Sequence, residues 1–208
     1  YSPDVISFAR EKGYFDGVNK DFSFANAYAP LDFGARRYCE ARVWSYFNMF
    51  TARGNEFLPY ILGDTDTPMP LFVKPNRKIS VQDVKNAMRD HYEGTPLDIS
   101  KDFGAGPYHT PYRLSPLSFK VGDKEYFNER PISTQQSGFV FVAQMRSTLP
   151  DAIGGVLWFG TDDANMTVFT PVYCCTDKVP VCYSRVDGAD YITFSWNSSF
   201  WIFNWVSN

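Results

Sequence analysis

Residues Ser137–Cys175 read SGFVFVAQMRSTLPDAIGGVLWFGTDDANMTVFTPVYCC, and this stretch decides the predicted fold. It contains three apolar runs, each rich in Val, Phe, Tyr or Trp: Gly138–Met145, Gly154–Phe159 and Met166–Tyr173. The gaps between them hold turn-forming residues, Leu149–Asp151 and Thr161–Asn165. Short β-branched and aromatic runs bounded by such residues are typical of strands in a buried sheet. We therefore expect a well-buried sheet whose second and third strands form a hairpin.

The clearest helical pattern covers residues 35–51. Its apolar arc at ~100° per residue consists of Ala35, Tyr38, Cys39, Tyr46 and Met49, so we expect Cys39 to lie in the core. Arg36, Arg37, Glu40 and Asn48 occupy the far side. Arg42 breaks the pattern because it lies within the apolar arc. A guanidinium buried there needs a partner, whereas a side chain that snorkels to the surface needs none.

Start and stop signals predict the remaining elements. They indicate a helix from Ser2 to Gly13, a helix from the capping box Ser80–Asp83 to Gly94, a hairpin over 118–127, a short strand at Tyr191–Phe194 and a helix from Ser198. His91 reads as an ordinary residue at the end of its helix. His109, Tyr112 and Arg113 lie in a predicted loop, where they either line a cleft or satisfy the loop backbone. The fold class is therefore α+β, and we predict no internal domain boundary.

Composition excludes several classes of function. The chain has 208 residues and a formal net charge of −3, which does not indicate a nucleic-acid binder. No apolar run approaches the ~20 residues needed to span a bilayer. Aromatic residues make up 18% of the chain. We interpret this share as a large packed core, with a carbohydrate-stacking surface as the alternative.

The cysteines leave two interpretations open. Cys174, Cys175 and Cys182 lie close in sequence, so one of the first two could pair with Cys182 in a disulfide, which would imply an oxidising compartment. The alternative is that they are buried free thiols. A periplasmic or secreted location is therefore expected, and a cytoplasmic one stays open.

Familiar catalytic patterns are missing from the sequence. It has only two histidines, far apart, and it contains no G-x-S-x-G, H-E-x-x-H, C-x-x-C, P-loop or dinucleotide glycine motif. We therefore expect neither a metal nor a cofactor.

Long segments of the chain resemble a family of N-terminal-nucleophile dipeptidases, cysteine enzymes related in fold to penicillin V acylase and choloylglycine hydrolase. The resemblance is carried by FVFVAQMRS and GGVLWFGTDDANMTVFTPVYC, and also by SFAREKGYFDG, CEARVWSYFN, PYRLSPLSFKVGDKEYFNERPISTQQSGF and FSWNSSFWIFNWV. It covers nearly the whole chain and matches the later half of the family. Residues 1–208 are thus expected to be the C-terminal portion of such an enzyme.

The resemblance implies a fold, a reaction and a partner. The sheet would belong to an αββα sandwich with mostly antiparallel strands. A cysteine exposed at the start of the mature chain would attack a dipeptide or short peptide, with its own α-amino group as general base. Tyr1 cannot be that nucleophile, so we expect the nucleophile in a preceding N-terminal half of the same enzyme and an inactive chain without it. The alternative is a non-catalytic peptide- or glycan-binding domain, and oligomer formation stays open.

Candidate site residues follow partly from the resemblance. Glu40–Trp44 is similar to the S-R-F-x-R segment of the acylases, which implies that Arg42 supports the thiolate or a substrate carboxylate. Asp163 and Asn165 resemble family residues and are substrate-binding candidates together with Arg113, although a tight turn needs the same chemistry. Arg146 could form an ion pair with Asp151 or Asp163, and we favour a structural role for it.

Overall fold

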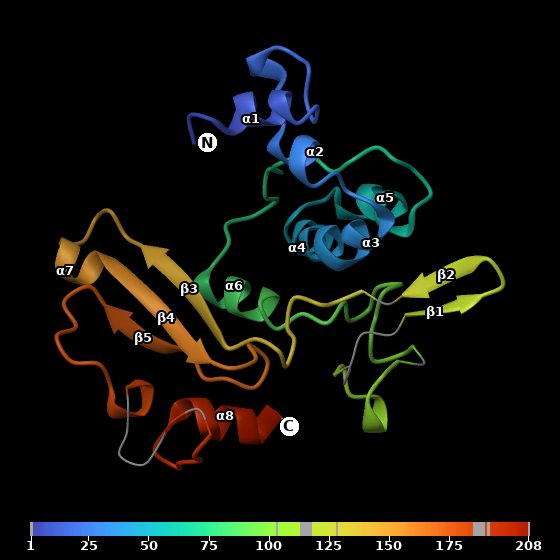
Figure 1. The fold of residues 1–208 in the computed structure, drawn as a ribbon. Helices are drawn as coiled ribbons and strands as arrows, with labels where there is room; N and C mark the ends of the chain where they lie inside the picture. The colour runs from blue at the N-terminus through green and yellow to red at the C-terminus, as the bar shows by residue number, and fades with distance from the viewer. Residues whose placement is uncertain are drawn as a thin grey trace.

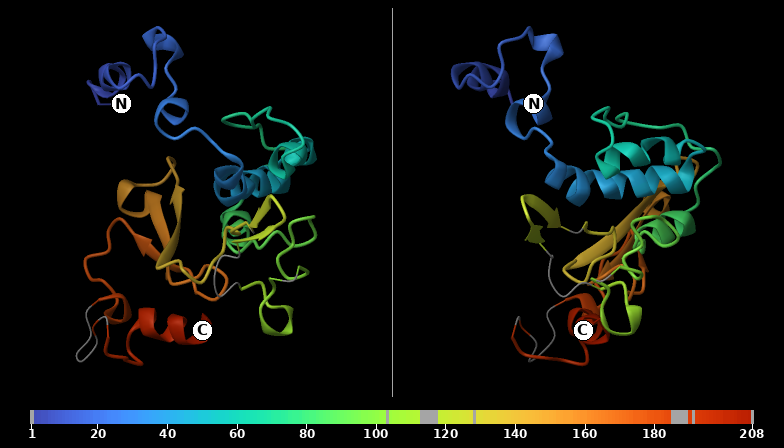
Figure 2. Two further views of the ribbon diagram at one scale, coloured as in Figure 1. Left: turned by 45° about the vertical axis from the view of Figure 1, so that its right-hand side comes forward. Right: turned by 90° about the vertical axis from the view of Figure 1, so that its right-hand side faces the viewer.

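The computed structural model describes residues 2–102, 104–112, 118–127, 129–184, 190 and 192–207. They form an α+β structure, as predicted (Figure 1). The helices are α1 Val5–Glu11, α2 Phe24–Tyr28, α3 Phe33–Ala35, α4 Ala41–Phe50, α5 Leu58–Leu62, α6 Val81–Ala87, α7 Asp151–Gly154 and α8 Ser199–Ser207. Short 3₁₀ turns cover Asn19–Asp21, Gly54–Phe57, Pro107–His109 and Val181–Tyr183. In Figure 2 the segment with α1 and α2 projects away from the other elements, and α8 lies at the opposite end of the molecule.

The predicted sheet is present and antiparallel. Its strands β3 Phe139–Met145, β4 Gly155–Thr161 and β5 Thr170–Tyr173 are ordered β3-β4-β5. Val142 lies opposite Trp158, which in turn lies opposite Pro171. The pairing of β4 with β5 confirms the expected hairpin. The short helix α7 connects β3 to β4.

Only one face of the sheet is buried, so the expectation of a well-buried sheet was wrong. Side chains alternate between the two faces of a strand. Val140 and Val142 pack with Phe169 and Ala164 against Val81, Val84 and Met88 from α6 and its C-terminal end. On the other face of β3, Phe139, Phe141 and Met145 are 61%, 51% and 80% exposed. The side chains of β3 are apolar on both faces, so the sequence alone does not show which face this chain covers and which it leaves exposed.

The predicted helix over 35–51 is present, but its buried face differs from the expected one. The chain is helical from α3 through a π turn, Arg36–Glu40, into α4. A π turn holds more residues than an α turn and therefore rotates the helix face. Ala41, Trp44 and Ser45 form the buried face, whereas Cys39 is exposed. Arg36, placed on the far side by its periodicity, is buried, and its guanidinium stacks on Tyr60 at 4.3 Å.

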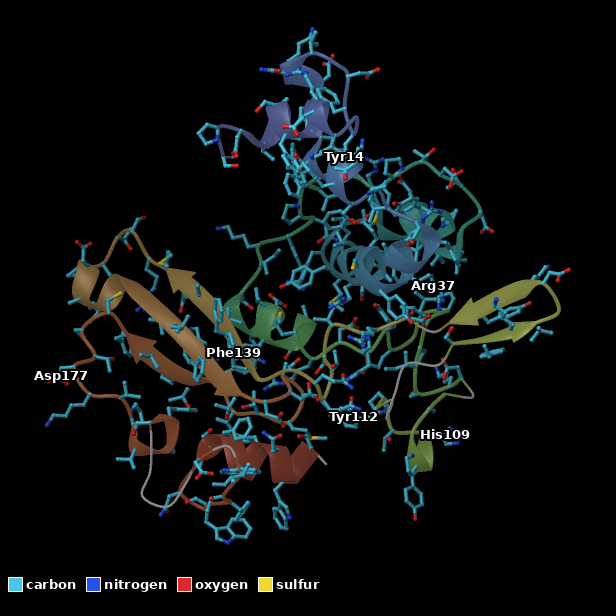
Figure 3. All side chains as sticks on the ribbon, viewed as in Figure 1. Tyr14, Arg37, His109, Tyr112, Phe139 and Asp177 are labelled. Atoms are coloured by element: carbon cyan, nitrogen blue, oxygen red, sulfur yellow. The ribbon has the colours of Figure 1, made fainter. Side chains whose placement is uncertain are left out.

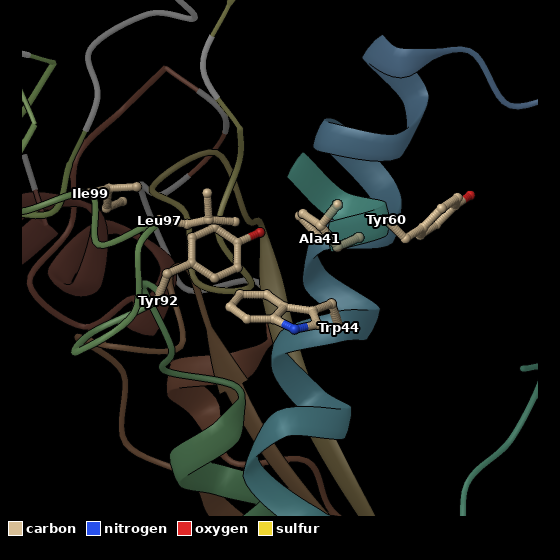
Figure 4. Close-up of a cluster of buried hydrophobic side chains, with 7 residues drawn as sticks. Ala41, Trp44, Tyr60, Tyr92, Leu97 and Ile99 are labelled. Atoms are coloured by element: carbon tan, nitrogen blue, oxygen red, sulfur yellow. The ribbon is translucent and has the colours of Figure 1, made fainter. Parts of the chain in front are cut away.

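The main core lies between α4, α5 and the loop that follows α6 (Figure 4). Its buried members are Ala41, Trp44, Tyr60, Ile61, Tyr92, Leu97 and Ile99. The rings of Trp44 and Tyr92 lie 6.4 Å apart, and both side chains are fully buried. The indole N–H of Trp44 donates to the carbonyl of Gly54 at 3.0 Å, so its polar atom is satisfied. This core fixes the loop 90–99 against α4.

Local signals predicted the other elements unevenly. The capping box of Ser80 and Asp83 is present, but α6 ends at Ala87 rather than near Gly94. The hairpin β1 Ser118–Val121 and β2 Lys124–Phe127 is also present, with Gly122 at φ 59° in its turn. Residues 192–194 are not in a strand, and Tyr191 lies outside the described residues.

Candidate functional site

The turn that joins β4 to β5 carries two adjacent buried carboxylates, Asp162 and Asp163. Asp162 has a left-handed backbone with φ 69°, and its N–H donates to the carbonyl of Gly138 at 3.0 Å. The carbonyl of Asp163 accepts the N–H groups of Met166 and Thr167. The predicted turn is therefore present. Asp162 and Asp163 are nevertheless only 2% and 0% exposed, unlike the carboxylates of an ordinary surface turn.

Distant segments of the chain converge on these carboxylates. The hydroxyl of Ser133 donates to Asp163 Oδ1 and accepts the backbone N–H of Asn165 at 3.2 Å. The Asn165 amide Nδ2 donates to the hydroxyl of Tyr112 at 2.8 Å. The hydroxyl of Ser207 in α8 donates to the carboxylate of Asp162. The end of β4 thus gathers polar groups from three other parts of the chain.

Asp163 is incompletely satisfied in this arrangement. Within the described residues, its Oδ2 is buried and accepts no hydrogen bond of good geometry. Burial is the main cause that raises the pKa of Tyr112, and the hydrogen bond from Asn165 opposes this shift. The negative charges of Asp163 and Asp162, together with a hydrogen bond from the phenol to Asp163, add to it. A neutral phenol hydroxyl is therefore held beside a buried carboxylate.

His91 packs against the ring of Tyr112. Their rings meet edge to face at 5.7 Å, and His91 is 2% exposed. Its Nδ1 lies 3.0 Å from Glu93 Oε1, while its Nε2 has no partner among the described residues. The interpretation of His91 as an ordinary helix-end residue was wrong, because α6 stops earlier and the chain turns into the core.

Asp90 connects this site to the central helix. Its carboxylate accepts the hydroxyl of Ser45 in α4 at 2.7 Å, and its carbonyl accepts the N–H of Ser133 at 3.1 Å. Burial raises the pKa of Asp90, and the hydrogen bond from Ser45 partly opposes the shift. Hydrogen bonds through Ser133 and Asp90 therefore link the turn after β4 to α4.

Arg42 belongs to a second polar cluster. It is half-buried, and its Nε and Nη2 donate to the carbonyl of Tyr38, one turn earlier, at 2.9 and 2.6 Å. A buried ion pair forms nearby, where Arg37 Nη2 lies 2.6 Å from Glu129 Oε2 with side chains 15% and 5% exposed. Burial raises the pKa of Tyr92, the charge of Glu129 adds to this shift, and Arg42 opposes it, so Arg42 lies within electrostatic range of Tyr92.

The other candidate residues have different outcomes. Tyr112, Asp163 and Asn165 are brought together, whereas Arg113 lies outside the described residues. His109 is exposed and lies at the periphery, while Tyr112 lies toward the centre of the molecule (Figure 3). Arg146 donates to the carbonyl of Ile153, and no described ion pair joins it to Asp151 or Asp163.

Sequence reasoning did not identify Ser133, Asp90 or His91 as members of the site. The run Asp90-His91-Tyr92-Glu93 was the available signal, because titratable and aromatic residues there directly follow a helix that packs against the sheet.

Neither interpretation of the cysteines was correct. Cys174, Cys175 and Cys182 are free and exposed. The thiol of Cys174 instead approaches the carbonyl of Gly155 across the β4–β5 pair at 3.6 Å. The expectation of an oxidising compartment thereby loses the disulfide on which it rested.

Two clefts lie along β3. The smaller has a volume of about 270 Å³ and is lined by Met88, Ile132, Ser137, Phe139, Val140, Phe141 and Ala164. The larger, about 630 Å³, lies between the start of α6 and Val142–Met145. Within the described ranges, no three His, Cys, Asp or Glu side chains gather closely enough to hold a metal ion. No helix in the same ranges has the length and apolar character of a membrane span.

Comparison with known proteins finds one family that matches the whole chain. The model of peptidase family C69 matches residues 1–208. A probable dipeptidase of Salmonella dublin is 31% identical over 172 residues, which are 83% of this chain and 34% of that protein. Probable dipeptidase B of Lactococcus lactis subsp. lactis is 26% identical over 84% of this chain and 32% of its own length. Dipeptidase A of Lactobacillus helveticus is 27% identical over 79% and 29%, respectively. The chain thus spans about a third of the length of these relatives.

Proposed function

This chain belongs to peptidase family C69, and from that premise we propose that it is the C-terminal portion of a dipeptidase with a cysteine nucleophile. The complete enzyme hydrolyses the peptide bond of dipeptides or short peptides. A cysteine at the mature N-terminus, in a segment that precedes these residues, attacks the carbonyl carbon. Its α-amino group, which titrates near ~8 in its ordinary state, accepts the thiol proton and protonates the leaving amine. Water then hydrolyses the thioester that has formed, which releases the carboxylic acid and restores the cysteine.

The match of the family model over all 208 residues carries this proposal. The names of the relatives add the substrate class, since each is a dipeptidase or a probable one. The chain's own cysteines, including Cys39, are internal and therefore have no chain-end amine to act as base. The polar site around Asp163 contains no described cysteine. A nucleophile outside residues 1–208 is consistent with this.

The open face of the sheet supports the expectation of an αββα sandwich. Phe139, Phe141 and Met145 present a contiguous apolar surface on β3, and the rings of Phe139 and Phe159 stack at 6.1 Å. Large exposed apolar patches commonly mark a surface that packs against another element. We propose that a second sheet from the remainder of the enzyme covers this face and forms the outer wall of the smaller cleft, which Phe139 and Phe141 line.

Two groups of residues would serve the reaction. Tyr112 and Asn165 would form a polar wall that contacts the substrate, and the buried carboxylate of Asp163 would lie behind it. Arg42, whose guanidinium is held on the carbonyl of Tyr38, would support the thiolate or the substrate carboxylate by its charge. Its tether to the helix backbone would limit its movement and so keep the charge in a fixed position.

The decisive experiment uses the full-length protein. Replacement of the cysteine at its mature N-terminus by alanine should abolish dipeptide cleavage while the far-UV circular dichroism and the melting temperature stay at the wild-type values. Mass spectrometry of the wild-type enzyme should find that cysteine, and no preceding residue, at the chain start. Full activity of the alanine variant would refute the proposed nucleophile.

An exposed aromatic cluster favours a second candidate, a peptide- or glycan-binding domain without catalysis. Trp196 and Trp205 are 62% and 67% exposed and meet edge to face at 5.1 Å. Such rings can stack on sugars or apolar side chains. Titration of the full-length protein with oligosaccharides, followed by tryptophan fluorescence, tests this alternative. A saturable change that Trp205→Ala removes, in a protein that cleaves no dipeptide, would favour it over the peptidase.

A further inference from the structure

We propose that Tyr112, Asp163 and Asn165 form the subsite that receives the free α-ammonium group of the dipeptide. This inference rests on the proposed dipeptidase function and assigns one end of the substrate to one group of residues. Asn165 and Tyr112 would contact the ammonium, and Asp163 would supply the negative charge beneath them.

Uncompensated negative charge is the first observation behind this subsite. Asp162 and Asp163 are adjacent and almost fully buried, yet neither takes part in any ion pair found among the described residues. Arg89 is close to the same turn, but it donates to the carbonyls of Ala164 and Thr167 at 3.0 and 3.5 Å and to neither carboxylate. A buried charge without a counter-ion is costly, so this turn favours the arrival of a cation.

The hydrogen-bonding capacity of the site is the second observation. Asp163 Oδ2 is buried and, within the described residues, lacks a donor of good geometry. Asn165 directs its Nδ2 to Tyr112, which leaves its Oδ1 available as an acceptor. The hydroxyl of Tyr112 accepts that amide hydrogen and can turn its own hydrogen toward Asp163, so an oxygen lone pair remains. The two half-buried side chains thus present two acceptors, which can take two of the three hydrogens of an ammonium group.

The smaller cleft lies next to this turn. It is lined by Ala164 and Ile132, the chain neighbours of Asp163 and Ser133. Its volume of about 270 Å³ lies just below the ~300–1,000 Å³ typical of pockets for drug-sized ligands. A ligand as small as a dipeptide fits this size better than a long peptide does.

Substrate pairs that differ only at the amino end test the assignment. Steady-state kinetics of the full-length enzyme would be measured with alanyl-alanine and with N-acetyl-alanyl-alanine, which lacks the ammonium charge. We expect the wild-type kcat/KM to favour the free dipeptide. In Asp163→Asn this preference should fall by about 10- to 100-fold, mainly through the KM of the free dipeptide, because the negative charge that attracts the ammonium is lost. Asp98→Asn, which alters another buried carboxylate (Asp98 is 7% exposed), should retain the wild-type preference.

Tyr112→Phe gives a second, milder measurement that stands even if Asp163→Asn fails to fold. It removes one hydroxyl from a half-buried ring and should shift the same preference in the same direction. If the wild-type enzyme cleaves neither peptide, the proposed dipeptidase function fails. If it cleaves both equally well, or if the folded variants keep the wild-type preference, the ammonium subsite is wrong and the dipeptidase function stands.

Discussion

The hydroxyl of Ser133 donates a hydrogen bond to the buried carboxylate of Asp163, although the two residues are 30 positions apart in the chain. The same hydroxyl accepts the N–H of Asn165, and the Ser133 backbone N–H donates to the carbonyl of Asp90. One serine therefore joins the turn after β4 to the loop that packs on α4. Removal of the Ser133 hydroxyl should therefore affect both the stability of the fold and the candidate site.

Ser133→Ala should lower the free energy of unfolding by about 1–3 kcal/mol, because the buried carboxylate of Asp163 loses a charge-assisted hydrogen bond. Urea denaturation of the full-length protein measures this loss. Dipeptide turnover should fall as well, because the backbone N–H of Asn165 loses one of its two acceptors, Ser133 and Asp163. Ser7→Ala, at an exposed serine whose hydroxyl donates to the carbonyl of Asp4 just before α1, is the matched control and should change neither quantity. Equal stability of Ser133→Ala and wild type would show that this contact does not hold the turn.

Arg42→Leu should lower kcat/KM of the full-length enzyme by about 100-fold or more, the scale on which one electrostatic stabiliser acts. The leucine retains the apolar part of the side chain, so the melting temperature should change little. Arg53→Leu, at an exposed arginine just beyond α4 that pairs with Glu56, is the comparison variant and should keep wild-type kinetics. An unchanged rate in Arg42→Leu would mean that its guanidinium only satisfies the carbonyl of Tyr38.

Local chemistry was enough to predict the sheet and both hairpins. The Asp162–Asn165 cluster and Gly122 encode their turns within a few residues, and the β-branched runs beside them have no competing periodicity. The capping box at Ser80 likewise marks where α6 begins. Its end could not be read in the same way, because the packing of Tyr92 into the core stops the helix before the glycine that would have ended it.

Features that depend on distant packing were not predictable. The π turn at Arg36–Glu40 rotates the helix, so a constant angle per residue placed Arg36 outside and Cys39 inside. The partners of Asp163 come from segments tens of residues away, and a turn-forming sequence carries no mark of them. The identity of Asp163 and Asn165 could be read from the chain, whereas their burial could not.

The exposed thiols lead to a simple chemical prediction. Cys39, Cys174, Cys175 and Cys182 should react with a maleimide reagent in the native protein, without reductant or denaturant. Peptide mapping by mass spectrometry would locate the labels, and the mapped peptides should carry no crosslink between Cys182 and its neighbours. A crosslink found under non-reducing conditions would restore the disulfide interpretation and, with it, the argument for an oxidising compartment.

The carboxyl group of Asp90 should make stability depend on pH in a definite direction. Burial raises its folded-state pKa above the value of about 3.9 that an unfolded chain has. Below that unfolded value the group is neutral in both states, and its favourable contribution is fully present. As pH rises through the raised folded pKa, this contribution to the free energy of unfolding is lost, because the unfolded carboxyl ionises freely whereas the buried one ionises only at a cost.

Asp90→Asn removes this titration but keeps an acceptor for the hydroxyl of Ser45. Its melting temperature relative to wild type should therefore increase from pH 4 to pH 7. Asp98→Asn should show the opposite trend, mostly below pH ~4, so its melting curves extend to pH ~2. Burial tends to raise the pKa of Asp98, but hydrogen bonds from Ser100 and Gly94 and the nearby Lys101 outweigh it and lower that pKa, so its contribution is lost as pH falls. Melting curves of wild type and both variants across these ranges decide the matter, and parallel curves for wild type and Asp90→Asn would show that Asp90 does not titrate as its burial requires.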